Sequence, residues 1–321
     1  MSAPRVIVVV KRTPYDRYIE EENDPEVKRL LKRRDPSVSS WLKAHRAHLA
    51  TLRRVESVLK RLGARFWVLH GPRLVFDASD AKLIVTVGGD GTLLAASHHV
   101  GSTPILGVNS SPHSSFGFFC AAQRSTVGPM LRRALDGQLE ALTLARMKVD
   151  VSGRVVSRRV LNEALFCHEI PAAASRYVIR HGRRQEAQIS SGCWVGTASG
   201  STGALRSAGG VVLPLTSQAL ELVVREPFGG AETPYEMTQL VVEPGSDVAI
   251  VNRMREARLF LDGPFQHVDI RIGERVTFAV SEEPVHVLGL TERRGRNEGP
   301  VVAPRGSRTA KTPRATKKRT R

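Results

Sequence analysis

The sequence predicts an α/β protein with an N-terminal doubly wound, mostly parallel sheet and a C-terminal antiparallel β-rich domain. Short apolar runs alternate with helix-like segments up to about residue 140, and closely spaced turn signals follow. The length of 321 residues also exceeds what one hydrophobic core usually holds. We therefore expect an α/β domain over residues 1–140, a β-rich domain over 141–290 and a disordered tail over 291–321.

The first half contains four strand-like and three helix-like segments. The expected strands cover residues 5–10, 64–69, 83–87 and 104–108, and the expected helices cover 41–62, 92–99 and 126–135. In the first helix, Leu49, Leu52 and Leu59 belong to an apolar stripe with three- and four-residue steps, and Gly63 is a natural stop. The charged stretch before Asp35 fits a loop or a short helix.

The pattern changes after about residue 142. Turn signals such as Ser152-Gly153, His181-Gly182 and Pro244-Gly245 separate short strand-like segments, and no long amphipathic stretch interrupts them. This half therefore predicts antiparallel strands, with the domain boundary near 138–142.

Composition limits the class of protein. Hydrophobic residues make up 41%, and no apolar run approaches the roughly 20 residues of a membrane span. The apolar start at 6–10 is too short for a signal-peptide core, so we expect a cytoplasmic protein. Cys120, Cys167 and Cys193 are scattered, which indicates neither a disulfide framework nor a zinc cluster, and we expect no metal site built by the protein.

The basic charge is concentrated at the C-terminus. Residues 291–321 hold eleven Lys and Arg against two Glu, about half of the net charge of +17. This tail is too poor in apolar residues to fold alone, so we expect a disordered solubilising extension that contacts polyanions only weakly.

The most informative motif comes directly after the third expected strand. Gly88, Gly89, Asp90, Gly91 and Thr92 stand where a parallel strand ends and a helix begins. Glycines let the backbone approach a pyrophosphate, and the helix N-terminus favours its charge. A carboxylate there repels phosphate unless it holds Mg²⁺ or takes a proton from an attacking hydroxyl. The motif therefore favours phosphoryl transfer to a hydroxyl, with a simple tight turn as the alternative.

Two further segments are rich in polar groups. Asn162-Glu163 places an amide beside a carboxylate, a pair suited to a base edge and a sugar diol but also to an ordinary surface. Residues 190–210 contain many small and hydroxyl side chains, which fit either a ligand loop or a flexible one.

Taken in order, the GGDGT motif, Asn162-Glu163 and the segment that ends in SAGG at 207–210 resemble the NAD kinase family. The resemblance covers roughly residues 5–290. It is closest to the plant NADH-kinase-like branch, through Gly107-Val108-Asn109-Ser110, Ser190-Ser191-Gly192 and Arg225-Glu226-Pro227.

The resemblance implies transfer of phosphate from ATP to the 2′-hydroxyl of the adenosine ribose of NAD⁺ or NADH, with Asp90 as the catalytic general base. Mg²⁺ would enter with ATP, and the chain would form a homodimer or homotetramer. The implied ligand contacts, from the diphosphate to the adenosine, are Gly88, Gly89, Gly91, Thr92, Asn162, Glu163, Ser191, Thr202, Gly203, Ala204, Leu205, Arg206 and Ser207.

Two positions depart from the commoner bacterial pattern of the family. Ser191 replaces an Asp, and Ala204 replaces a Tyr. Loss of an anion near a cationic nicotinamide weakens discrimination against the neutral reduced ring. We therefore expect NADH to be accepted at least as well as NAD⁺.

Other interpretations remain open at this level. A diacylglycerol- or sphingosine-type lipid kinase carries a similar loop, and a catalytically poor dinucleotide sensor would need no base. The adjacent His98 and His99 look like ordinary helix residues, and Asp262-Gly263 like a hairpin turn.

Overall fold

The computed structural model describes residues 3–71, 75–229 and 234–292, so most of the expected tail lies outside the described residues. Its first sheet follows the order β2-β1-β3-β4-β19-β6, with β5 paired to β4. All its pairs are parallel except β19 with β6. The strands are β1 (Arg5–Val10), β2 (Arg65–His70), β3 (Leu83–Gly88), β4 (Ile105–Asn109), β5 (Ala122–Gln123), β6 (Ala141–Leu144) and β19 (Val285–Leu288).

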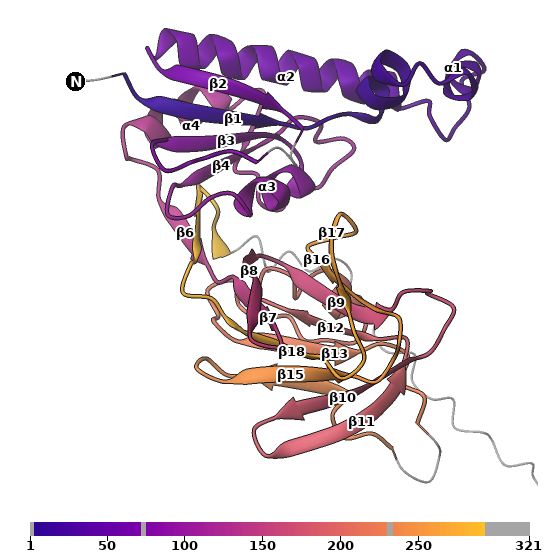
Figure 1. Ribbon diagram of the computed structural model, residues 1–321. Helices are drawn as coiled ribbons and strands as arrows, with labels where there is room; N and C mark the ends of the chain where they lie inside the picture. The colour runs from indigo at the N-terminus through magenta and orange to yellow at the C-terminus, as the bar shows by residue number, and fades with distance from the viewer. Residues whose placement is uncertain (1–2, 72–74, 230–233, 293–321) are drawn as a thin grey trace, which may run out of the picture.

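Helices cover both faces of this sheet (Figure 1). Alternate residues of a strand point to opposite faces, so Val8 packs with α2 and α4 while Val9 packs with α3. The helical segments are the π-helix η1 (Asp16–Glu21), α1 (Pro25–Lys32), α2 (Trp41–Arg61), α3 (Asp90–Ser97), α4 (Val127–Leu135) and the short α5 (Ala204–Ser207) of the second half.

The second half is a sandwich of two antiparallel sheets around one apolar core. One sheet has the order β11-β10-β15-β18-β7-β8, and the other has the order β14-β13-β12-β9-β16-β17. Their strands are β7 (Met147–Val151), β8 (Arg154–Val160), β9 (Glu163–His168), β10 (Ser175–His181), β11 (Arg184–Ser190), β12 (Cys193–Gly196), β13 (Leu220–Val224), β14 (Gln239–Val242), β15 (Asp247–Asn252), β16 (Ala257–Leu261), β17 (Gln266–Ile270) and β18 (Arg275–Val280).

The predicted fold class is confirmed, and the structure adds one crossing that the sequence did not indicate. After β18 the chain returns to the first sheet, where β19 pairs with β4 and β6. Residues 141–144 and 285–288 therefore belong to the first sheet, although the expected boundary assigns them to the second domain. Two connections consequently join the halves, which places α3 opposite the β16–β17 hairpin (Figure 1).

In the described residues, no helix combines the length and apolar character that a membrane crossing requires. The three cysteines are free thiols, and Cys120 and Cys193 are buried.

Candidate active site

The GGDGT motif forms the junction between β3 and α3. Gly88 ends the strand, Gly89 is the N-cap, and Asp90 is the first residue of the helix, two residues earlier than expected. A Cβ on Gly88 would overlap the Thr92 hydroxyl, so only glycine fits there. The motif thus places backbone N–H groups and the positive end of a helix at the C-terminal edge of the parallel sheet, a suitable place for phosphate.

One oxygen of the Asp90 carboxylate accepts a backbone hydrogen bond. Its Oδ1 accepts a hydrogen bond from the Phe119 N–H at 2.8 Å, and Oδ2 makes no hydrogen bond to the described residues. Phe119 belongs to the loop after β4, which starts beside the motif, where the Ser110 N–H donates to the Gly88 carbonyl at 2.8 Å. The side chain is therefore oriented, and one oxygen remains available to a hydroxyl.

Asn162 and Glu163 lie at the corner where the chain passes from β8 to β9, and so from one sheet of the sandwich to the other. The Asn162 Oδ1 atom is buried without a hydrogen-bond partner. Burial, and then the charge of Asp262, raise the pKa of Glu163 to about 7. A buried polar atom without a partner costs stability, which is typical of a group that a ligand satisfies.

The glycine- and hydroxyl-rich segment packs directly on this corner. The Thr197 N–H donates to the Asn162 carbonyl at 2.9 Å, and a Cβ on Gly200 would overlap the same carbonyl. The Ser199 hydroxyl is buried without a partner. The second and third sequence motifs are therefore brought together.

The predicted adenosine segment follows as a turn and the short helix α5. Gly203, Arg206 and Ser207 are exposed, whereas Thr202 and Ala204 are partly buried. Leu205 is fully buried, so its side chain contributes packing, and its expected ligand contact stays a prediction.

Ser191 lies apart from this group. Gly196, at one end of β12, pairs with Glu163, and Ser191 precedes the other end of the strand. At the usual rise of a strand, these five residues span roughly 16 Å. Ser191 therefore does not join the Asn162–Glu163 corner within one chain, and its contact with a dinucleotide stays a prediction.

The structure reveals a contact between the two halves that the sequence did not predict. His98 Nε2, at the end of α3, lies 2.8 Å from Oδ2 of Asp262 in the β16–β17 turn. Asp262 is a hairpin residue, as expected, but its carboxylate is 2% exposed and accepts hydrogen bonds from the corner amides. The sequence contained one signal for a buried Asp262, because the Asp-Gly turn directly follows an apolar strand.

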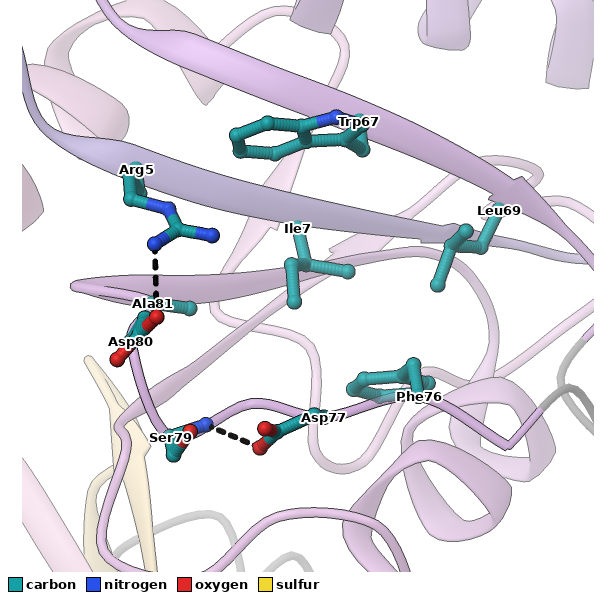
Figure 2. Close-up of a pocket in the computed structure, with 9 residues that line it drawn as sticks. All are labelled: Arg5, Ile7, Trp67, Leu69, Phe76, Asp77, Ser79, Asp80 and Ala81. Atoms are coloured by element: carbon teal, nitrogen blue, oxygen red, sulfur yellow. Dashed lines mark hydrogen bonds and ion pairs between the residues drawn. The ribbon is translucent and has the colours of Figure 1, made fainter.

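A cavity of about 250 Å³ lies elsewhere, against β1 and β2 (Figure 2). Trp67, Ile7 and Phe76 line it together with the Arg5–Asp80 ion pair. None of the motif residues lines this cavity.

Comparison with known proteins identifies the family of this chain. Residues 6–139 match the model of the ATP-NAD kinase N-terminal domain. A probable NADH kinase of Oryza sativa subsp. japonica is 30% identical over 281 residues, covering 80% of this chain and 86% of the relative. The chain belongs to the NAD kinase family. An NADH kinase of Arabidopsis thaliana is 27% identical over 290 residues, covering 82% of this chain and 91% of the relative, and supports the plant-like branch of the NAD kinase family.

Two solved structures confirm the NAD kinase fold. An NAD kinase from Archaeoglobus fulgidus in complex with ATP aligns with a TM-score of 0.65 at 23% identity, covering 91% of this chain and 96% of the other. Yeast NADH kinase complexed with NADH aligns with a TM-score of 0.64 at 16% identity, covering 93% and 88%.

Proposed function

We propose that the protein transfers the γ-phosphoryl group of ATP to the 2′-hydroxyl of the adenosine ribose of NAD⁺ and NADH, with Asp90 as the general base. One observation carries this assignment. Asp90 begins a helix beside a glycine turn, with Oδ1 held by the Phe119 N–H and Oδ2 without a hydrogen bond to the described residues.

The reaction follows from this placement. Asp90 Oδ2 accepts the proton of the 2′-hydroxyl as the hydroxyl oxygen bonds to the γ-phosphorus. The bond from the γ-phosphorus to the oxygen bridging to the β-phosphate breaks, and ADP leaves with that electron pair. A positioned base typically contributes a factor of about 10²–10⁴ to the rate.

The other predicted residues bind and orient the substrates in this proposal. The amides at Gly88, Gly89 and Gly91 and the Thr92 hydroxyl contact the diphosphate. Asn162 and Glu163 bind the adenine and the ribose hydroxyls, and the buried, unpartnered Asn162 Oδ1 supports this role. Residues 202–207 close over the adenosine.

Mg²⁺ fits this site as an ion carried by ATP. The described His, Cys, Asp and Glu residues form one group able to hold a metal, Asp16, Glu20 and His45, which does not include Asp90. Mg²⁺ usually keeps several waters and binds through phosphates and one or two carboxylates. When bound, it would neutralise phosphate charge, with Asp90 as the nearby carboxylate.

We further propose that NADH is accepted at least as well as NAD⁺, which the names of the two plant relatives support. A homodimeric or homotetrameric assembly and a cytoplasmic location stay predictions.

The variant Asp90→Asn tests the role of the base. It keeps an oxygen that can accept from Phe119 but cannot take the proton, so we expect kcat to fall by a factor of about 10²–10⁴. We expect the KM for the dinucleotide to change less than about threefold, because binding is retained. Asp136→Asn, an exposed residue after α4, is the control and should keep full activity. An Asp90→Asn enzyme with more than a tenth of the wild-type kcat would contradict the assignment.

A further inference from the structure

The end of helix α3 is held by the opposite half of the molecule. His98, the C-cap of α3, lies with Nε2 2.8 Å from Asp262 Oδ2, and the two side chains are 7% and 2% exposed. The direction of the contact departs from an ideal hydrogen bond, so it is a close polar contact. The Arg159 guanidinium donates to the His98 carbonyl at 3.2 Å and also pairs with Glu283.

Asp262 in turn holds the corner that carries Asn162 and Glu163. Its Oδ2 accepts from the Leu161 N–H at 2.7 Å, and its Oδ1 accepts from Asn162 at 2.7 Å and Glu163 at 3.1 Å. Its own N–H donates to the Glu163 carbonyl at 2.9 Å. Asp262 adopts a left-handed backbone, with φ of 49°, which a non-glycine residue keeps only where its surroundings fix it.

Asp90 and His98 stand at the two ends of the same helix. Eight residues at the helical rise of 1.5 Å separate them by about 12 Å along a rigid element. Figure 1 shows α3 on the side of its domain that faces the β16–β17 hairpin. The position of the base is thus tied, through His98 and Asp262, to the position of the corner.

We propose that His98 is a positioning residue: through Asp262 it fixes the Asn162–Glu163 corner relative to Asp90. The proposal rests on the proposed function, because it assigns the corner to the acceptor and Asp90 to the proton transfer. Small displacements between reacting groups lower the rate strongly, and a misplacement of about 1 Å can cost a factor of about 10².

The kinetic test compares three variants. His98→Leu removes the polar contact, His98→Gln keeps a side-chain amide that can reach the carboxylate, and His99→Leu alters the next residue, whose ring lies beside Phe76. We expect His98→Leu to lower kcat at least tenfold while the KM for ATP stays within about twofold. We expect His98→Gln to recover at least a third of the wild-type kcat, and His99→Leu to behave as wild type. Unchanged kcat in His98→Leu, or an equal loss in His99→Leu, would overturn the proposal.

Amide hydrogen exchange at Leu161–Glu163 provides a test that needs no activity. We expect exchange at least tenfold faster in His98→Leu than in the wild type, with protection restored in His98→Gln. Unchanged protection in His98→Leu would overturn the positioning role, even if kcat had fallen. If the wild type forms no NADP⁺ or NADPH, the proposed function fails, and the exchange result still decides whether His98 supports the corner.

Discussion

At the residue scale, burial changes the acid–base behaviour of Glu163. Its pKa is raised to about 7, first by burial and then by the charge of Asp262, so near neutral pH it is only partly ionised. In the proposed function a ribose hydroxyl donates to the ionised carboxylate, so we expect substrate binding to compete with protonation of Glu163. The raised pKa also means that this group lowers the stability of the fold as pH rises from about 4.5 to about 7.

The pH dependence of substrate binding tests this account of Glu163. We expect the KM for the dinucleotide to fall as pH rises from 6 to 8, by up to about tenfold per unit below the pKa. Glu163→Gln cannot ionise, so its KM should be independent of pH over this range. It should also unfold at higher denaturant concentration than the wild type at pH 8. A KM that falls equally with pH in both proteins would contradict this role.

At the residue scale, the sequence identified the groups that lie close together in the chain. Two short motifs allowed candidate site residues to be predicted without a structure. They are the glycine turn with Asp90, and the pair Asn162 and Glu163. Asp262 was assigned only a turn, and His98 only a place on a helix. These two residues are far apart in the sequence. Neither the periodicity of apolar residues nor the spacing within a motif predicts a contact between them.

At the scale of elements, the strands and helices of the first half lie close to where apolar patterning placed them. The helix after β3 starts at Asp90 rather than Thr92, because Gly89 adopts an extended conformation and acts as the N-cap. This difference of two residues matters, since it puts Asp90 in the first turn of the helix. The return of β19 to the first sheet could not be predicted, because the sequence of a short apolar strand does not indicate which sheet the strand joins.

Arg146 links the elements that cross between the two halves. It lies between β6 and β7 with a fully buried side chain, and its guanidinium donates to the carbonyls of Ser97, Val100, Glu283 and Pro284. Burial lowers its pKa to about 10, so it stays charged at neutral pH. It thereby ties the C-terminal end of α3 to the segment that leads back into β19.

Removing this side chain should destabilise the fold. Arg146→Met removes the guanidinium that donates to four carbonyls, of which the Ser97 carbonyl still accepts from the Val100 N–H, so we expect the free energy of unfolding to fall by about 3 kcal/mol. Arg158→Met breaks an exposed pair with Glu282 and should cost far less, because solvent screens exposed ion pairs. Urea unfolding of both variants measures the difference. Equal costs would contradict the role given to Arg146.

At the scale of the whole molecule, the proposed function gives the two halves separate tasks that meet at α3. In this proposal the parallel sheet provides a strand end and a helix N-terminus for phosphate, and the sandwich provides the corner with buried polar groups for the acceptor. The sequence indicated both domain classes from the change in pattern near residue 140. How the halves face each other depends on buried contacts such as that of His98 with Asp262, which only the folded chain shows.

An assay of the purified wild-type protein with ATP and Mg²⁺, in parallel reactions with NAD⁺ and with NADH, tests the proposed function. An NADP-specific dehydrogenase detects the product, which separates 2′-phosphorylation from simple ATP hydrolysis. We predict NADP⁺ from NAD⁺ and NADPH from NADH, with a kcat/KM for NADH at least equal to that for NAD⁺. An NADH reaction more than tenfold less efficient would contradict the proposed redox preference, and no product from either dinucleotide would contradict the proposed function itself.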